Sequence, residues 1–73
     1  MNLKQMEYFV AAAEQLNFTR AAKKCFISQT AMTLQIQSLE EKIGVPLFVR
    51  DKHHVELTAA GKVYLNEARA ILV

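Results

Sequence analysis

Residues 17–39 contain two short helical patterns separated by a break too small to be a loop between independent elements. Asn17 precedes the first pattern and Ser28 precedes the second, and both residue types commonly cap helix N-termini. Small and apolar side chains recur at helical spacing in the first pattern, at Phe18, Ala21, Ala22 and Cys25, and in the second, at Met32, Ile36, Leu39 and Ile43. Two helices joined this closely predict a helix-turn-helix.

The opposite face of the second predicted helix is neutral and able to form hydrogen bonds. It consists of Gln29, Thr30, Thr33, Leu34 and Gln37. A face that only meets solvent would normally carry Lys and Glu. Amides and hydroxyls suit DNA base edges, because Gln can bind adenine through two hydrogen bonds and a Thr methyl can contact the thymine methyl. From these residues alone, base reading and a merely exposed neutral helix both stay open.

The length and composition indicate one small domain that depends on packing. The chain has 73 residues, of which 52% are hydrophobic, and its single Cys25 allows no internal disulfide. The formal charge of +2 is too mild to indicate nucleic acid by itself. No apolar run approaches the roughly 18 residues of a membrane span, and the N-terminus lacks the apolar segment of a signal peptide. We therefore expect a cytoplasmic protein with no membrane partner.

A further helix is predicted before the helix-turn-helix motif, and the end of the motif's second helix is also marked in the sequence. Residues 3–15 follow a possible Asn2 cap, and their predicted buried stripe is Leu3, Met6, Phe9, Val10 and Ala13. The helix that begins after Ser28 should end at Ile43, because Gly44 is typical just past a helix end and Pro46 prevents continuation.

The rest of the chain predicts a hairpin and a last helix. Residues 47–50 and 55–58 are short strand-like runs around the polar turn 51–54. Thr58 can cap a helix that runs to the C-terminus. The apolar residues of that helix form a seam expected to pair two copies of the chain: Val63, Tyr64, Leu65, Ala68, Ile71 and Leu72.

Five motifs in a fixed order cover essentially the whole chain: LKQMEYFVAAAE, FTRAA, SQTAMTLQIQSLE, GVPLFVR and LTAAG. Together they resemble the DNA-binding domain and linker helix of LysR-type transcriptional regulators. The resemblance implies a mainly α fold, with a winged helix-turn-helix (a three-helix core and a β-hairpin wing) in residues 1–57 and a linker and dimerisation helix in residues 58–73.

The resemblance also implies a function. A homodimer joined by the linker helix would bind a dyad-related operator in double-stranded DNA sequence-specifically, without enzymatic activity or a cofactor. Full-length relatives carry a larger effector-binding domain after this helix, so no small-molecule ligand is expected for these 73 residues.

The same resemblance implies roles for individual residues. Gln29 and Thr30 match positions that reach base edges, and Ser28 and Thr33 match positions that tend to contact the DNA backbone. Three residues depart from the usual pattern: Thr30 stands where relatives commonly have Pro, Leu34 where many have Arg, and Glu56 where many have a basic residue. Leu34 could instead offer an apolar contact to thymine methyls.

Charged residues on either side of this helix are candidates for phosphate contacts. Arg20 lies in the first turn of its helix, where backbone N–H groups and the helix dipole favour phosphate, whereas Lys23 and Lys24 are more simply solubilising. Arg50 matches a phosphate-contacting position in relatives, and an ion pair with Asp51 or Glu56 is the alternative. The remaining candidates form the predicted wing tip, over a minor groove or its flanking phosphates: Lys52, His53 and His54.

The residue types and their spacing argue against other kinds of functional site. Asp51, His53 and His54 could suggest zinc or nickel, but neighbours on a tight turn rarely converge on one ion, so no metal site is expected. Cys25 is interpreted as a small buried hydrophobe. Catalytic sets of residues are not found. The aromatic residues are predicted to lie in the core or to be partly buried: Tyr8, Phe9, Phe18, Phe26 and Phe48. The alternative from another class is a protein-interaction module that docks a partner on residues 58–73.

Overall fold

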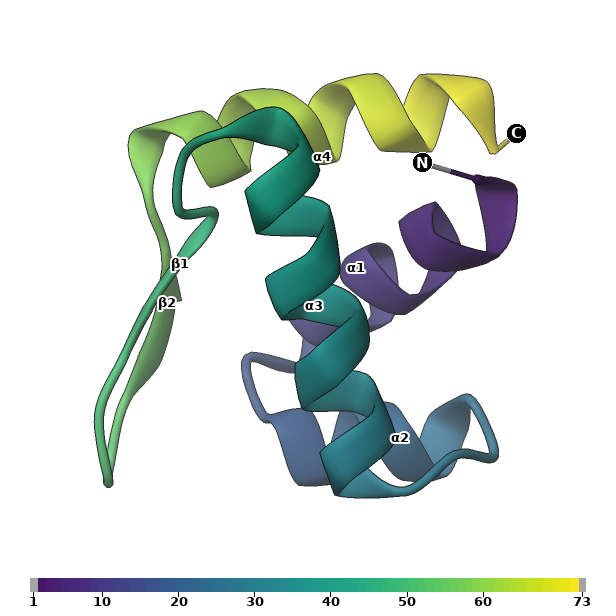
Figure 1. The fold of residues 1–73 in the computed structure, drawn as a ribbon, viewed down its shortest axis with the longest axis vertical. Coiled ribbons are helices and arrows are strands. Elements are labelled where there is room, and N and C mark those ends of the chain that lie inside the picture. The colour runs from purple at the N-terminus through teal and green to yellow at the C-terminus, as the bar shows by residue number, and fades with distance from the viewer. Residues whose placement is uncertain (1, 73) are drawn as a thin grey trace.

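Four helices and one antiparallel hairpin make up the computed structural model, which describes residues 2–72. In chain order the elements are α1 (Leu3–Gln15), α2 (Phe18–Lys24), α3 (Gln29–Ile43), β1 (Phe48–Arg50), β2 (Val55–Leu57) and α4 (Ala59–Ile71). Helices α1, α2 and α3 pack together, the hairpin stands beside α3 as a wing, and α4 crosses over the end opposite α2 (Figure 1). The predicted winged helix-turn-helix with a C-terminal helix is confirmed.

Each helix is capped at its N-terminus by the polar residue that the sequence indicates. The side-chain oxygens of Asn2, Asn17, Ser28 and Thr58 each accept a hydrogen bond from the backbone N–H three residues later, at 2.8 to 3.0 Å. These bonds satisfy N–H groups that have no partner inside the helix. Helix α3 ends as predicted, because Gly44 adopts a φ of 90°, which favours glycine.

The core lies where the three helices meet the base of the wing. Its fully buried large side chains are Phe9, Met32, Ile36, Leu39 and Leu47. Phe48, at the start of β1, contacts the rings of both Phe9 and Phe18, with centroids 5.4 and 5.3 Å apart. The wing therefore contributes its first residues to the same core as the helices.

Two predicted core residues lie elsewhere, and a third, Cys25, packs only at the edge of the core. Leu3 is 60% exposed, because the first turn of α1 lies at the end of the molecule away from α2 (Figure 1). Phe26 is 93% exposed, because it occupies the turn between α2 and α3 with a φ of 59° that directs its side chain outward. Cys25 is only half-buried, and burial raises the pKa of its thiol.

The wing is anchored at its base by hydrogen bonds from two helices. A carboxylate oxygen of Glu40 on α3 accepts the backbone N–H groups of Leu47 and Phe48, at 2.7 and 3.2 Å. Thr58 donates its hydroxyl to the carbonyl of Pro46 at 2.8 Å, and its backbone N–H bonds the carbonyl of Leu47 at 3.0 Å. The strands then pair in register: Phe48 with Leu57, Val49 with Glu56 and Arg50 with Val55.

Helix α4 packs closely against its own domain, and this corrects the predicted seam. Ala68 is fully buried, and the ring of Tyr64 meets Phe9 edge-on with centroids 4.9 Å apart. Leu65 also packs against the core. The sequence pattern could not show that α1 would occupy this face of α4. The large apolar side chains that α4 does expose are Val63, at 63%, and Ile71, at 54%.

Candidate nucleic-acid interface

A cleft of about 310 Å³ opens between the wing and the first turns of α2 and α3. Six of the residues predicted to bind DNA line it: Gln29, Thr33, Arg50, Lys52, His53 and His54. The others lie outside its lining: Arg20, Ser28, Thr30, Leu34 and Gln37, all on exposed surface. Because the first turn of α3 and the tip of the wing reach the same end of the molecule (Figure 1), one extended ligand can contact both.

The face of α3 that was predicted to read bases is turned to solvent. Gln29, Thr30, Leu34 and Gln37 are exposed and Thr33 is half-buried, whereas Met32 and Ile36 are fully buried on the opposite side. The hydroxyl oxygen of Ser28 accepts the N–H of Ala31, which leaves its own O–H free to donate. The helix thus presents neutral donors and acceptors on a rigid support.

Gln29 is held by a contact that the sequence analysis missed. The hydroxyl of Thr19, in the first turn of α2, donates a hydrogen bond to Oε1 of Gln29 at 2.8 Å. The two residues are ten positions apart on different helices, so helical spacing gives no signal of this contact. Thr19 also lines the cleft.

Arg50 is positioned by an aromatic ring. Its guanidinium carbon Cζ lies 4.7 Å from the centroid of the Phe18 ring, within the range of a cation–π interaction. Among the described residues, neither Asp51 nor Glu56 forms the ion pair with Arg50 that the sequence left open. The charge of Arg50 therefore stays available to an anion in the cleft.

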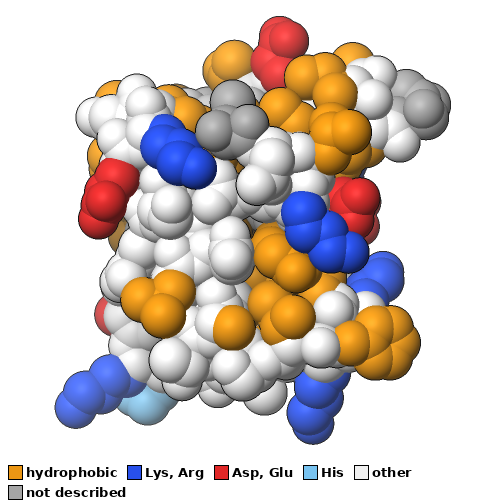
Figure 2. Space-filling view, turned by 45° about the vertical axis from the view of Figure 1, so that its right-hand side comes forward, with side chains coloured by type: hydrophobic (Ala, Val, Ile, Leu, Met, Phe, Trp, Pro, Cys, Tyr) orange, Lys and Arg blue, Asp and Glu red, His pale blue; other side chains and the backbone are white. Residues whose placement is uncertain are grey.

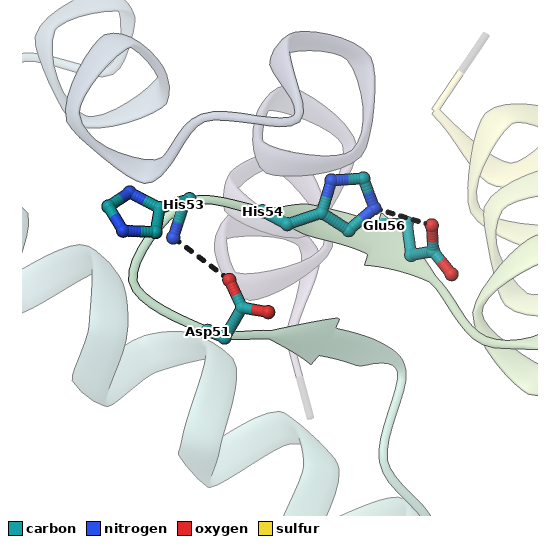
Figure 3. Close-up of polar contacts among 4 residues, drawn as sticks. All are labelled: Asp51, His53, His54 and Glu56. Atoms are coloured by element: carbon teal, nitrogen blue, oxygen red, sulfur yellow. Dashed lines mark hydrogen bonds and ion pairs between the residues drawn. The ribbon is translucent and has the colours of Figure 1, made fainter.

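The tip of the wing is a short turn closed by local hydrogen bonds (Figure 3). A carboxylate oxygen of Asp51 accepts the backbone N–H of His53 at 2.8 Å, and the backbone N–H of Asp51 bonds the carbonyl of His54 at 2.9 Å. The ring of His53 points away from His54 and Glu56 (Figure 3). All four residues of the turn are exposed, so nothing in the domain covers their side chains.

His54 is paired with the acid of β2. Its Nε2 lies 2.6 Å from a carboxylate oxygen of Glu56. This hydrogen bond, together with the negative charge of Glu56, raises the pKa of His54 above its ordinary value. Protonated His54 persists to higher pH as a result, but Glu56 offsets part of its charge.

The basic side chains at this end of the molecule favour an anionic ligand. Lys, Arg and His side chains project at the lower edge of the view in Figure 2, where other Lys and Arg side chains and the visible acidic side chains lie higher. Within residues 2–72, no group of three or more His, Cys, Asp or Glu side chains is arranged to hold a metal ion. Nor is any helix in that range long and apolar enough to cross a membrane.

Comparison with known proteins identifies the same architecture. A family model described as the bacterial regulatory helix-turn-helix protein, lysR family, matches residues 3–62. The chain is 56% identical over 72 residues to the Hca operon transcriptional activator HcaR of Escherichia coli (strain K12), a match that covers 99% of this chain and 24% of HcaR. The chain thus spans about a quarter of this relative, which is named as a regulator of transcription and not as an enzyme.

Two solved structures of protein–DNA complexes are similar over almost the whole chain. The CbnR_DBD–DNA complex has a TM-score of 0.95 at 46% identity, covering 99% of this chain and 83% of that one. The complex of BenM_DBD with benA site 1 DNA has a TM-score of 0.93 at 39% identity, covering 99% and 81%. The chain therefore belongs to the lysR family of bacterial regulatory helix-turn-helix proteins, and its winged helix-turn-helix is the DNA-binding domain of that family.

Proposed function

We propose that this domain binds a specific duplex DNA sequence, with α3 in the major groove and the wing against the adjacent backbone and minor groove. The observation that carries the proposal is the cleft in which Gln29 and Thr33 of α3 face Arg50 and the wing tip. A neutral hydrogen-bonding helix beside a cationic turn matches what DNA presents, because base edges lie in the groove and phosphates lie along its rim. The two similar structures named above are DNA complexes, which supports this assignment.

Residue roles follow from the chemistry of each position. Phosphates are contacted by the guanidinium groups of Arg20 and Arg50 and by the Ser28 hydroxyl, while Lys52, His53 and His54 flank the minor groove. Bases or nearby backbone are contacted by the exposed face of α3: Gln29, Thr30, Thr33, Leu34 and Gln37. Leu34, 59% exposed, has no charge to offer and meets thymine methyls.

The biological unit is proposed to be a homodimer on a dyad-related operator, because one module of this size reads few base pairs. The side chains that α4 exposes suggest which residues pair in this dimer. Val63 and Ile71 are the large apolar side chains that α4 exposes, whereas Tyr64, Leu65 and Ala68 pack against the domain itself. Leu72, just after α4, is half-buried. Sedimentation equilibrium tests this assembly, and a strict monomer at high protein concentration would contradict it.

Transcriptional regulation by a longer protein in the bacterial cytoplasm is part of the same proposal. HcaR, of which this chain spans 24%, is named as an operon activator. The domain described here supplies recognition of DNA to such a protein.

Selection from random duplexes, followed by titration of the selected sequence, tests the proposal. We expect steeply salt-dependent binding, and Gln29→Ala should lose about 1 to 3 kcal/mol on the selected site and relax the preference at one base pair. Asn66→Ala is the control, since it removes an exposed amide on α4, away from the cleft. Negligible affinity for duplex DNA at every salt concentration would instead favour the protein-interaction module.

A further inference from the structure

The hydrogen bond between Thr19 and Gln29 joins the two helices of the motif at the cleft. Thr19 Oγ1 lies 2.8 Å from Gln29 Oε1, and both side chains are exposed and line the cleft. The position of Thr19 is itself well defined, because its neighbour Phe18 is buried in the core and Asn17 caps the helix. The hydroxyl is carried on a β-branched side chain, which has few χ1 rotamers. Thr19 is therefore a rigid donor aimed at a flexible amide.

Fixing the amide of Gln29 determines what it can recognise. One end of the amide is an acceptor with two lone pairs and the other carries two N–H donors. With Oε1 turned toward Thr19, the oxygen keeps one lone pair for a second donor and the NH₂ group stays free. Adenine matches this arrangement in the major groove, because its N6 donates and its N7 accepts. Guanine does not match it, because both N7 and O6 accept, and O6 would face the fixed oxygen.

We propose that Thr19 is a positioning residue that sets the base preference of Gln29, favouring adenine over guanine at the base pair Gln29 contacts. This inference rests on the proposed function, since it requires that Gln29 meets a base edge. A Gln29 side chain released from Thr19 rotates more freely and can offer its NH₂ group alone to guanine. Loss of the Thr19 hydroxyl therefore reduces the preference for adenine over guanine more than it weakens overall DNA binding.

Two substitutions separate the hydroxyl from the shape of the side chain. Thr19→Val keeps the β-branched shape and removes the hydroxyl, whereas Thr19→Ser keeps the hydroxyl. The assay measures affinities of the full 73-residue chain for duplexes that carry adenine or guanine at the base pair where Gln29→Ala relaxes selection. Thr19→Val should reduce the adenine-to-guanine preference about three- to tenfold, the range expected for one hydrogen bond. Thr19→Ser should retain the parental preference.

A double-mutant cycle with Gln29→Ala shows whether Thr19 acts through Gln29. Thr19→Val should change the preference in the parent but not in the Gln29→Ala background. Equal weakening of all duplexes with a shallower salt dependence would overturn the inference, because it would identify Thr19 as a phosphate contact. An unchanged preference in Thr19→Val, while Gln29→Ala still relaxes selection, would overturn it and leave the proposed function intact. If Gln29→Ala itself has no effect, the proposed base contact is wrong.

Discussion

Helix α3 and the wing face the same cleft but are built in opposite ways. The exposed face of α3 has no charged side chain between Gln29 and Gln37, and it is supported by the fully buried Met32 and Ile36. The wing tip, residues 51–54, is charged and exposed, and only local hydrogen bonds hold it. Reading base edges requires fixed hydrogen-bond geometry, whereas attraction to phosphates tolerates motion. Under the proposed function, this difference separates a region that specifies sequence from one that supplies affinity.

The base of the wing is tied to the helices by hydrogen bonds, in contrast to its tip. Glu40 ties Leu47 and Phe48 to α3, and Thr58, the N-cap of α4, bonds the carbonyls of Pro46 and Leu47. Helix α4 also approaches closely at Gly61, where an added Cβ would lie 2.1 Å from the carbonyl oxygen of Leu47. The glycine of the LTAAG motif is thus required by the distance between α4 and the start of the wing.

The largest predicted effect follows from that close approach. Gly61→Ala forces α4 away from Leu47 and should lower the free energy of unfolding by about 3 kcal/mol, the upper end of the usual range for overpacking. Thermal and urea unfolding followed by circular dichroism measures it. Gly44→Ala is the control, because nothing lies within 4 Å of its added Cβ and only its positive φ is strained, at about 1 kcal/mol. Equal losses for the two variants would show that the wing base is not tightly packed.

A smaller effect is expected in the turn of the helix-turn-helix. Phe26 combines a φ of 59° with a 93% exposed ring, so the folded state gains little from the ring while the backbone is strained. Phe26→Asn should raise the free energy of unfolding by about 1 kcal/mol, because Asn tolerates this conformation better. Unfolding curves test this, and a destabilised variant would mean that the ring has a partner within the fold.

The smallest effect concerns pH at the wing tip. Glu56 raises the pKa of His54, so the pair stabilises the fold fully below the ordinary pKa of histidine, and the contribution is lost as pH rises through the raised value. DNA affinity should fall over the same interval as His54 loses its charge. NMR titration of Glu56→Gln should give a lower His54 pKa than the parent. An unchanged pKa would show that the two side chains do not interact in solution.

Local signals in the sequence predicted most of the fold, and tertiary contacts account for what they missed. The four N-caps, the Gly44 stop and the hairpin depend on residues within a few positions of one another. The burial of Ala68 depends on where α1 lies against α4, and the outward Phe26 depends on the geometry of a turn.

In the candidate site, too, local signals were predictable from the sequence and tertiary contacts were not. The neutral face of α3 was evident from helical periodicity. The Thr19–Gln29 bond and the placement of Arg50 over Phe18 were not, because each joins residues from different elements.

The most direct test of the division between α3 and the wing compares Gln29→Ala with Arg50→Ala on the selected operator and on an unrelated duplex, across a range of salt concentrations. Gln29→Ala should weaken only the operator complex and leave the salt dependence unchanged. Arg50→Ala, like Arg20→Ala, should weaken both complexes and lower the slope of log affinity against log salt by about one unit. If Gln29→Ala weakens both duplexes alike, or if the loss in Arg50→Ala is confined to the operator, the assignment of reading to α3 and anchoring to the wing is wrong.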